Sequence, residues 1–152
     1  MRSFKVWLTV CCSLLAFASF AQMTKDNSVW TFEAKKRSGN QYEIIAHLKL
    51  EKGWHIYAMK PGGDGTLIAP SINFKPNPSL KLTGSVKEKG KLISQTVEGI
   101  SGKVNMYSGP VDYIQTAIIN GATTITGTYE YQICNDVMCL PPTTKQFKVS
   151  VK

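Results

Sequence analysis

Short apolar segments separated by turn residues constrain the fold of this chain more than any other feature of its sequence. In residues 42–50 every second side chain is apolar, which is typical of a strand with one buried face. No stretch of ten or more residues repeats apolar side chains at helical spacing. The other expected strands are residues 29–34, 54–58, 71–74, 80–86, 91–97, 111–119, 122–133 and 146–151.

Gly, Pro and Asn separate these segments, for example in residues 38–40, 61–65 and 120–121. Eight or nine short strands with regular turns predict an all-β protein, built as an antiparallel sandwich of two sheets. A chain of 152 residues that is 43% hydrophobic and 18% charged forms one compact domain, which argues against a multidomain enzyme.

The first 21 residues have the pattern of an export signal. Arg2 and Lys5 precede a run of about 15 uncharged, mostly apolar residues, shorter than the roughly 20 that span a bilayer. Ser19 and Ala21 provide the small side chains that a cleavage site before Gln22 requires. We therefore expect a signal peptide at 1–21, cleaved near Ala21, and a mature periplasmic domain at 22–152.

The net charge is +8, but the positive residues are scattered and form no stripe or tract. We therefore expect no nucleic-acid partner. The sequence also contains no hydrolase nucleophile motif, and residues 61–65 lack the ending of a phosphate-binding loop.

Cys134 and Cys139 are the two cysteines outside the leader, and in an exported protein such a pair can form a disulfide. The alternation of residues 129–134 places Cys134 on the polar face, so we expect its sulfur to face away from the core and to be available to other molecules. A disulfide closing so short a loop stabilises a fold by only about 2 kcal/mol. Redox exchange, a structural hairpin disulfide and metal binding all remain open on this reasoning.

The residues around the pair modify these expectations. Asp136 lies inside the loop and disfavours a thiolate, which suits a relay that reacts when a partner docks. Pro141 and Pro142 restrict the returning chain to an extended conformation. This restriction either holds the chain beside Cys139 or is only a rigid exit from the turn.

The cysteine segment resembles the amino-terminal periplasmic domain family of the thiol:disulfide interchange protein DsbD, also called the disulfide bond corrector domain. The resemblance covers most of the chain after the leader. The segments that carry it are Tyr131-Gln132-Ile133-Cys134-Asn135-Asp136, Cys139-Leu140-Pro141-Pro142, Gly53-Trp54-His55-Ile56-Tyr57 and Met106-Tyr107.

This resemblance implies an immunoglobulin-like sandwich that passes electrons to oxidised periplasmic proteins. It implies that Cys139 forms mixed disulfides, that Cys134 resolves them, and that Tyr57 lies near the pair. Met106 and Tyr107 would form a lid over the sulfurs. The electron donor would be a thioredoxin-like domain fed by a membrane electron transporter, and we expect it to be a separate protein.

Several alternatives compete with this relay. His55 is either a proton partner for an exchanging thiol or an ordinary strand residue. The pair could join His47 and His55 in a zinc set, or methionines such as Met138 could bind copper(I), but the spacing favours neither, and we expect no metal and no cofactor. The competing function is an immunoglobulin-like binding or adhesion module with a passive hairpin disulfide. We expect a monomer.

Overall fold

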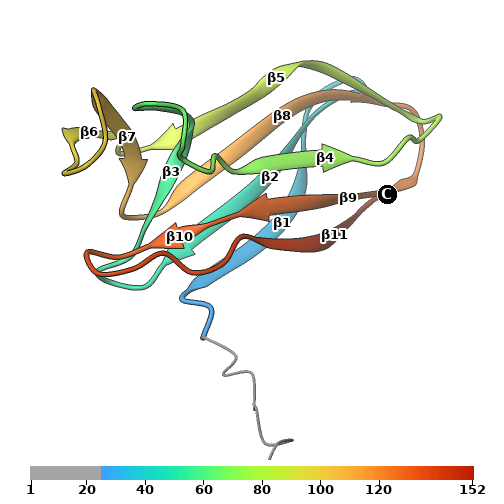
Figure 1. The fold of residues 1–152 in the computed structure, drawn as a ribbon. Coiled ribbons are helices and arrows are strands. Elements are labelled where there is room, and N and C mark those ends of the chain that lie inside the picture. Colours follow the sequence, from blue (N-terminus) through green and yellow to red (C-terminus); the bar gives the residue numbers. More distant parts are fainter. Residues whose placement is uncertain (1–24) are drawn as a thin grey trace, which may run out of the picture.

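The computed structural model describes residues 25–152, so the predicted export signal at 1–21 lies outside the described residues. The described part contains eleven strands and no helix, and hence no helix that could cross a membrane (Figure 1). The strands are β1 (Ser28–Ser38), β2 (Gln41–Leu50), β3 (His55–Gly62), β4 (Ser71–Phe74), β5 (Leu80–Gly90), β6 (Ile93–Thr96), β7 (Lys103–Tyr107), β8 (Val111–Ile119), β9 (Thr123–Tyr131), β10 (Ile133–Cys134) and β11 (Thr143–Val151).

All strand pairs are antiparallel, and they form three hydrogen-bonded sheets in the orders β1-β2-β8-β5, β10-β3-β7-β6 and β11-β9-β4. The main core lies between the first sheet and the other two, which are joined where β9 leads into β10 (Figure 1). The fold is therefore an immunoglobulin-like antiparallel β-sandwich, as the sequence predicts, with one of its layers divided into two sheets.

Aromatic side chains fill much of the space between the sheets. Trp30 stacks on Tyr113 with ring centroids 5.5 Å apart, and it also contacts Tyr129 and Tyr131. In the same core, Phe32 stacks on Phe147 with ring centroids 4.5 Å apart. Aromatic pairs of this kind add to the free energy gained by burying their area, so this cluster fixes how the sheets face one another.

A polar cluster fastens the start of the described chain to the layer that carries the cysteines. Asp26 accepts hydrogen bonds from Tyr131, Lys145 and Ser28. Burial opposes ionisation of Asp26, but these hydrogen bonds outweigh it and lower the pKa of the carboxyl. The cluster holds the end of β9 in place immediately before the chain enters β10.

The observed strands differ from the expected ones in two places. The expected strand at 122–133 ends at Tyr131, because the chain changes partners at Gln132: β9 pairs with β11 and β4, whereas β10 pairs with β3. Strand β7 was not expected. It lies between β3 and β6 and is only five residues long: Lys103 to Met106 alternate polar and apolar side chains, but Tyr107, which is buried on the other face, ends the pattern.

Candidate functional site

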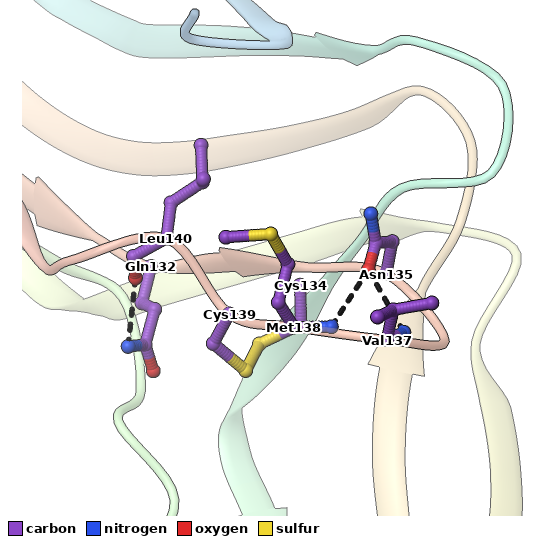
Figure 2. The surroundings of a disulfide bond; sticks show 7 residues. All are labelled: Gln132, Cys134, Asn135, Val137, Met138, Cys139 and Leu140. Carbon is purple, nitrogen blue, oxygen red and sulfur yellow. Dashed lines mark hydrogen bonds between the residues drawn. A yellow bond between two sulfur atoms is a disulfide. The ribbon is translucent and has the colours of Figure 1, made fainter. Parts of the chain in front are cut away.

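Cys134 and Cys139 form a disulfide across a narrow hairpin, with their Cα atoms 3.9 Å apart (Figure 2). Backbone hydrogen bonds lie on both sides of the bridge. On the loop side, the amide of Asn135 donates to the carbonyl of Met138 at 2.8 Å, and on the sheet side, the amide of Leu140 donates to the carbonyl of Ile133 at 2.9 Å. The two sulfur-bearing residues are therefore neighbours in an antiparallel bridge, independently of the bond between their sulfurs.

Side chains hold the same hairpin. The Oδ1 atom of Asn135 accepts hydrogen bonds from the amides of Val137 and Met138, which forms a turn closed by a side chain. On the sheet side, Nε2 of Gln132 donates to the carbonyl of Leu140 at 2.9 Å (Figure 2). None of these contacts involves a sulfur atom, so we expect them to persist, and the loop to keep its shape, when the disulfide is reduced.

Reducing the disulfide should accordingly have a small effect on stability. The bond closes a six-residue loop, for which the chain-entropy estimate is about 2 kcal/mol, and the hydrogen bonds around it remain. Urea unfolding of the oxidised and reduced protein should give free energies of unfolding that differ by about 2 kcal/mol or less. The double variant Cys134→Ala, Cys139→Ala should behave like the reduced form. Loss of cooperative unfolding on reduction would show instead that the fold depends on the disulfide.

The two sulfur-bearing residues differ sharply in exposure. Cys134 is 2% exposed and packs with Tyr57, Val104 and Met106 in a second apolar cluster, on the opposite face of the sheet from the main core. Cys139 is exposed. The alternation of the sequence thus predicts the face of Cys134, but the expectation that its sulfur is available to other molecules is wrong, because side chains from β3 and β7 cover that face.

A hollow of about 440 Å³ lies beside the disulfide. Its walls come from β3, β7, the segment at β6 and the cysteine loop. On the rim of the loop, Val137 is 90% exposed and Met138 is 47% exposed, although both side chains are apolar. These two apolar side chains form an exposed rim close to the exposed Cys139. The lining residues are His55, Tyr57, Gln95, Val97, Met106, Cys134, Asn135, Asp136, Val137, Met138 and Cys139.

Most of the side chains selected from the sequence line this hollow, but two do not. His55, Tyr57, Met106 and Asp136 lie around the cysteines. Tyr107 instead points into the main core, where it pairs with Ile56 across β3 and β7. Pro141 follows the hairpin as an exposed residue outside the lining.

Met106 therefore covers Cys134 without Tyr107. It is 4% exposed, pairs with Tyr57 within the sheet, and its sulfur lies 3.8 Å from the side-chain nitrogen of Gln95. Met106 reaches Cys134 from a strand that is paired on both sides, whereas the resemblance implies a lid made of Met106 and Tyr107 together.

Other residues of the site were not selected from the sequence. Gln95 and Val97 come from a distant segment and carry no recognisable signal. Asn135 does carry a sequence signal, because Asn after a strand commonly closes a turn through its side chain.

The electrostatics of the site are mild. Burial lowers the pKa of His55, although the nearby carboxylate of Asp136 acts in the opposite direction. Burial raises the pKa of Tyr57, so its phenol stays protonated at neutral pH. No Lys or Arg side chain lines the hollow.

The second histidine lies in another part of the fold. In the first sheet, Nδ1 of His47 is 2.7 Å from Asp112 and its Nε2 is 3.3 Å from Glu33. Across residues 25–152, no group of three or more His, Cys, Asp or Glu side chains is placed to hold a metal ion. The structure thus does not bring the two histidines and the two cysteines together as one ligand set.

Solved structures of similar fold carry related domains. The N-terminal periplasmic domain of ScsB from Proteus mirabilis has a TM-score of 0.57 and 20% identity, and the match covers 82% of this chain. The chain spans just under half of that protein, 46% of its length. The DsbD N-terminal domain from Neisseria meningitidis, in the reduced form, has a TM-score of 0.55 and 15% identity over 80% of this chain and 85% of that one.

A third structure contains the complex between the DsbD N-terminal and PilB N-terminal domains from Neisseria meningitidis. It has a TM-score of 0.50 and 12% identity over 84% of this chain and 87% of that one. At such identities these likenesses establish the fold alone. No curated protein matches the sequence.

The sequence itself establishes the family. Residues 20–151, which include every strand and both cysteines of the hairpin, match the family described as "Thiol:disulfide interchange protein DsbD, N-terminal". The chain therefore belongs to the family of DsbD N-terminal domains.

Proposed function

We propose that the protein relays reducing equivalents through the Cys134/Cys139 pair, from a thioredoxin-like donor or membrane electron transporter to oxidised periplasmic proteins. Membership in the DsbD N-terminal family supports a thiol–disulfide exchange module. The observation that carries the proposal is the unequal exposure of two bonded cysteines in a hairpin that other contacts hold together.

The unequal exposure divides the chemistry between the two sulfurs. In the reduced protein, the Cys139 thiolate attacks a partner disulfide, because Cys139 is the one that a partner can reach. A mixed disulfide forms and one partner thiolate leaves. Cys134 then attacks the Cys139 sulfur, which restores the internal disulfide and releases the second partner thiolate. Two electrons pass from the pair to the partner.

Recharging runs the same steps in reverse. A dithiol of the donor attacks the Cys139 sulfur, and Cys134 leaves as the thiolate and takes a proton. The donor then resolves the mixed disulfide and departs oxidised. Because Cys139 is the contact point in both directions, donor and acceptor must bind one surface in turn.

Thioredoxin-like donors suit the site for two reasons. The loop rim offers apolar contacts through Val137 and Met138 beside the reactive sulfur. In addition, a DsbD N-terminal domain of this fold has been solved in complex with the PilB N-terminal domain. The proposed location is the periplasm, with cleavage of 1–21 leaving the domain at 22–152, since the ScsB neighbour is a periplasmic domain.

A redox titration tests the relay against a passive disulfide. We expect the pair to equilibrate with a thioredoxin-like protein and to have a midpoint potential above about −300 mV, the level below which structural disulfides generally lie. The measurement is the reduced fraction, read by alkylation and mass shift after equilibration in dithiol buffers of stepped potential. A midpoint well below that value, with no exchange with thioredoxin, would leave only a binding module with a passive bond.

A further inference from the structure

The structure places a proton acceptor beside the buried sulfur. In the pairing of β10 with β3, Cys134 lies directly opposite His55, so their side chains occupy the same face of the sheet. Side chains in such cross-strand positions have Cβ atoms about 5 Å apart. Both residues also line the hollow beside the disulfide. Resting on the function proposed above, we propose that His55 accepts the thiol proton of Cys134 as this residue resolves a mixed disulfide.

The resolving thiol needs such a group because of where it lies. When a partner occupies Cys139, Cys134 must become a thiolate while 2% exposed and packed against Tyr57, Val104 and Met106. Burial of this kind disfavours the thiolate. The hollow is lined by no Lys or Arg side chain that could stabilise the negative charge of the thiolate. Transfer of the proton to a neighbouring side chain removes this obstacle.

Among the titratable side chains that line the hollow, the imidazole of His55 is the one suited to accept this proton. The other titratable groups that line the hollow are Tyr57 on the same strand, Cys134 on β10, and Asp136 and Cys139 in the loop. Tyr57 stays protonated because burial raises its pKa, and Asp136 lies in the exposed loop, whereas His55 lies directly opposite Cys134 in the sheet. Burial lowers the pKa of His55, which keeps the imidazole neutral and able to accept a proton.

The proposed step balances in atoms and charge. The Cys134 S–H bond breaks, and its proton moves to a ring nitrogen of His55. The thiolate attacks the Cys139 sulfur, so the Cys134–Cys139 bond forms as the bond from Cys139 to the partner breaks. The partner leaves as a thiolate and is protonated by the imidazolium or by water. The carboxylate of Asp136 favours the transient imidazolium electrostatically.

The reaction with dithiobis(nitrobenzoate) separates the two steps. Cys11 and Cys12 are replaced by serine in every form, so that only the hairpin pair is counted. The reduced protein should release a first nitrothiobenzoate as Cys139 reacts and a second as Cys134 resolves the mixed disulfide. In the unsubstituted hairpin, the second phase should become independent of pH above the pKa of His55.

In His55→Phe, which retains a ring against Tyr57, the second phase should slow by about a hundredfold at pH 7, the lower part of the range for a positioned proton acceptor. It should then rise about tenfold per pH unit as hydroxide takes over the role. The first phase should be unchanged. If both phases match the parent, or both slow equally, His55 has no part in proton transfer.

Two further variants make the test specific. His47→Asn removes the only other histidine and should leave both phases unchanged, because His47 contacts Asp112 and Glu33 in another sheet. Asp136→Asn should move the onset of the plateau to lower pH, because Asp136 raises the pKa of His55. An unmoved onset would contradict the proposal. Failure of the relay itself would look different, since the pair would then not equilibrate with a thioredoxin-like protein in the redox titration, whatever its two phases with dithiobis(nitrobenzoate).

Discussion

Replacing Cys139 by alanine should abolish disulfide exchange, whereas replacing Cys134 by alanine should stop the reaction at a mixed disulfide. The reason is the exposure of the two residues: a partner can reach Cys139, while Cys134 is 2% exposed beneath Tyr57 and Met106. Exchange requires a collision between a thiolate and a disulfide sulfur along an open path. The exposed cysteine is therefore necessary for the first bond and the buried one only for its release.

The measurement uses a thioredoxin-like protein that keeps only its attacking active-site cysteine, activated as a mixed disulfide with nitrothiobenzoate, which departs when Cys139 attacks. In every form Cys11 and Cys12 are serine. Cys134→Ala should accumulate a covalent adduct on non-reducing gels, and mass spectrometry should place the linkage at Cys139. Cys139→Ala should give no adduct. With dithiobis(nitrobenzoate), the parent should release two nitrothiobenzoates per chain and Cys134→Ala one. Adduct formation through Cys134 in the Cys139→Ala variant would reverse the assigned roles.

Replacing Gly127 by alanine should destabilise the sandwich by about 3 kcal/mol, the upper part of the usual range for an overpacked interior. A Cβ atom at this position would lie 2.2 Å from the backbone oxygen of Asn73 and 2.5 Å from the ring of Phe147. Neither can move away easily. Asn73 belongs to the neighbouring strand β4, and the Phe147 ring is fixed by Phe32 on one side and Phe74 on another.

Gly109→Ala is the matched control, because no atom lies within 4 Å of its new Cβ and its backbone does not have a positive φ. Urea unfolding of both variants gives the comparison. The control should lie within about 0.5 kcal/mol of the parent, as surface substitutions generally do. Equal stabilities of the two variants would mean that β4 and β9 do not pack as closely as the structure shows.

Much of the fold could be predicted from the sequence because half-buried strands record their surroundings in their alternation. β2 and β8 show this well, since each has one face in the core along its whole length. β7 is five residues long, and its alternation from Lys103 to Met106 ends at Tyr107, which is buried on the other face, so the run is too short to be predicted as a strand. The change of sheet at Gln132 is also invisible locally, because the alternation continues through it while the pairing partners change.

The site was predictable to the extent that its residues are close in sequence. The sequence predicts the cysteine pair, Asp136 and the segment with His55 and Tyr57 as site residues, and the structure gathers them around one hollow. The cover over Cys134 was not predictable in the same way. Its burial depends on side chains from β3 and β7, whose arrangement follows from tertiary packing and is not encoded in the cysteine motif.

The paired hydrogen bonds on either side of the disulfide have a consequence for the direction of electron flow. None of these hydrogen bonds involves a sulfur atom, so we expect the hairpin to stay closed in either redox state and the fold to favour the disulfide by no more than the roughly 2 kcal/mol that closing its loop contributes. The fold itself therefore does not strongly favour either the oxidised or the reduced form of the pair. In the proposed relay, the direction of exchange would then be set by mass action, through the relative supply of reduced donor and oxidised acceptor.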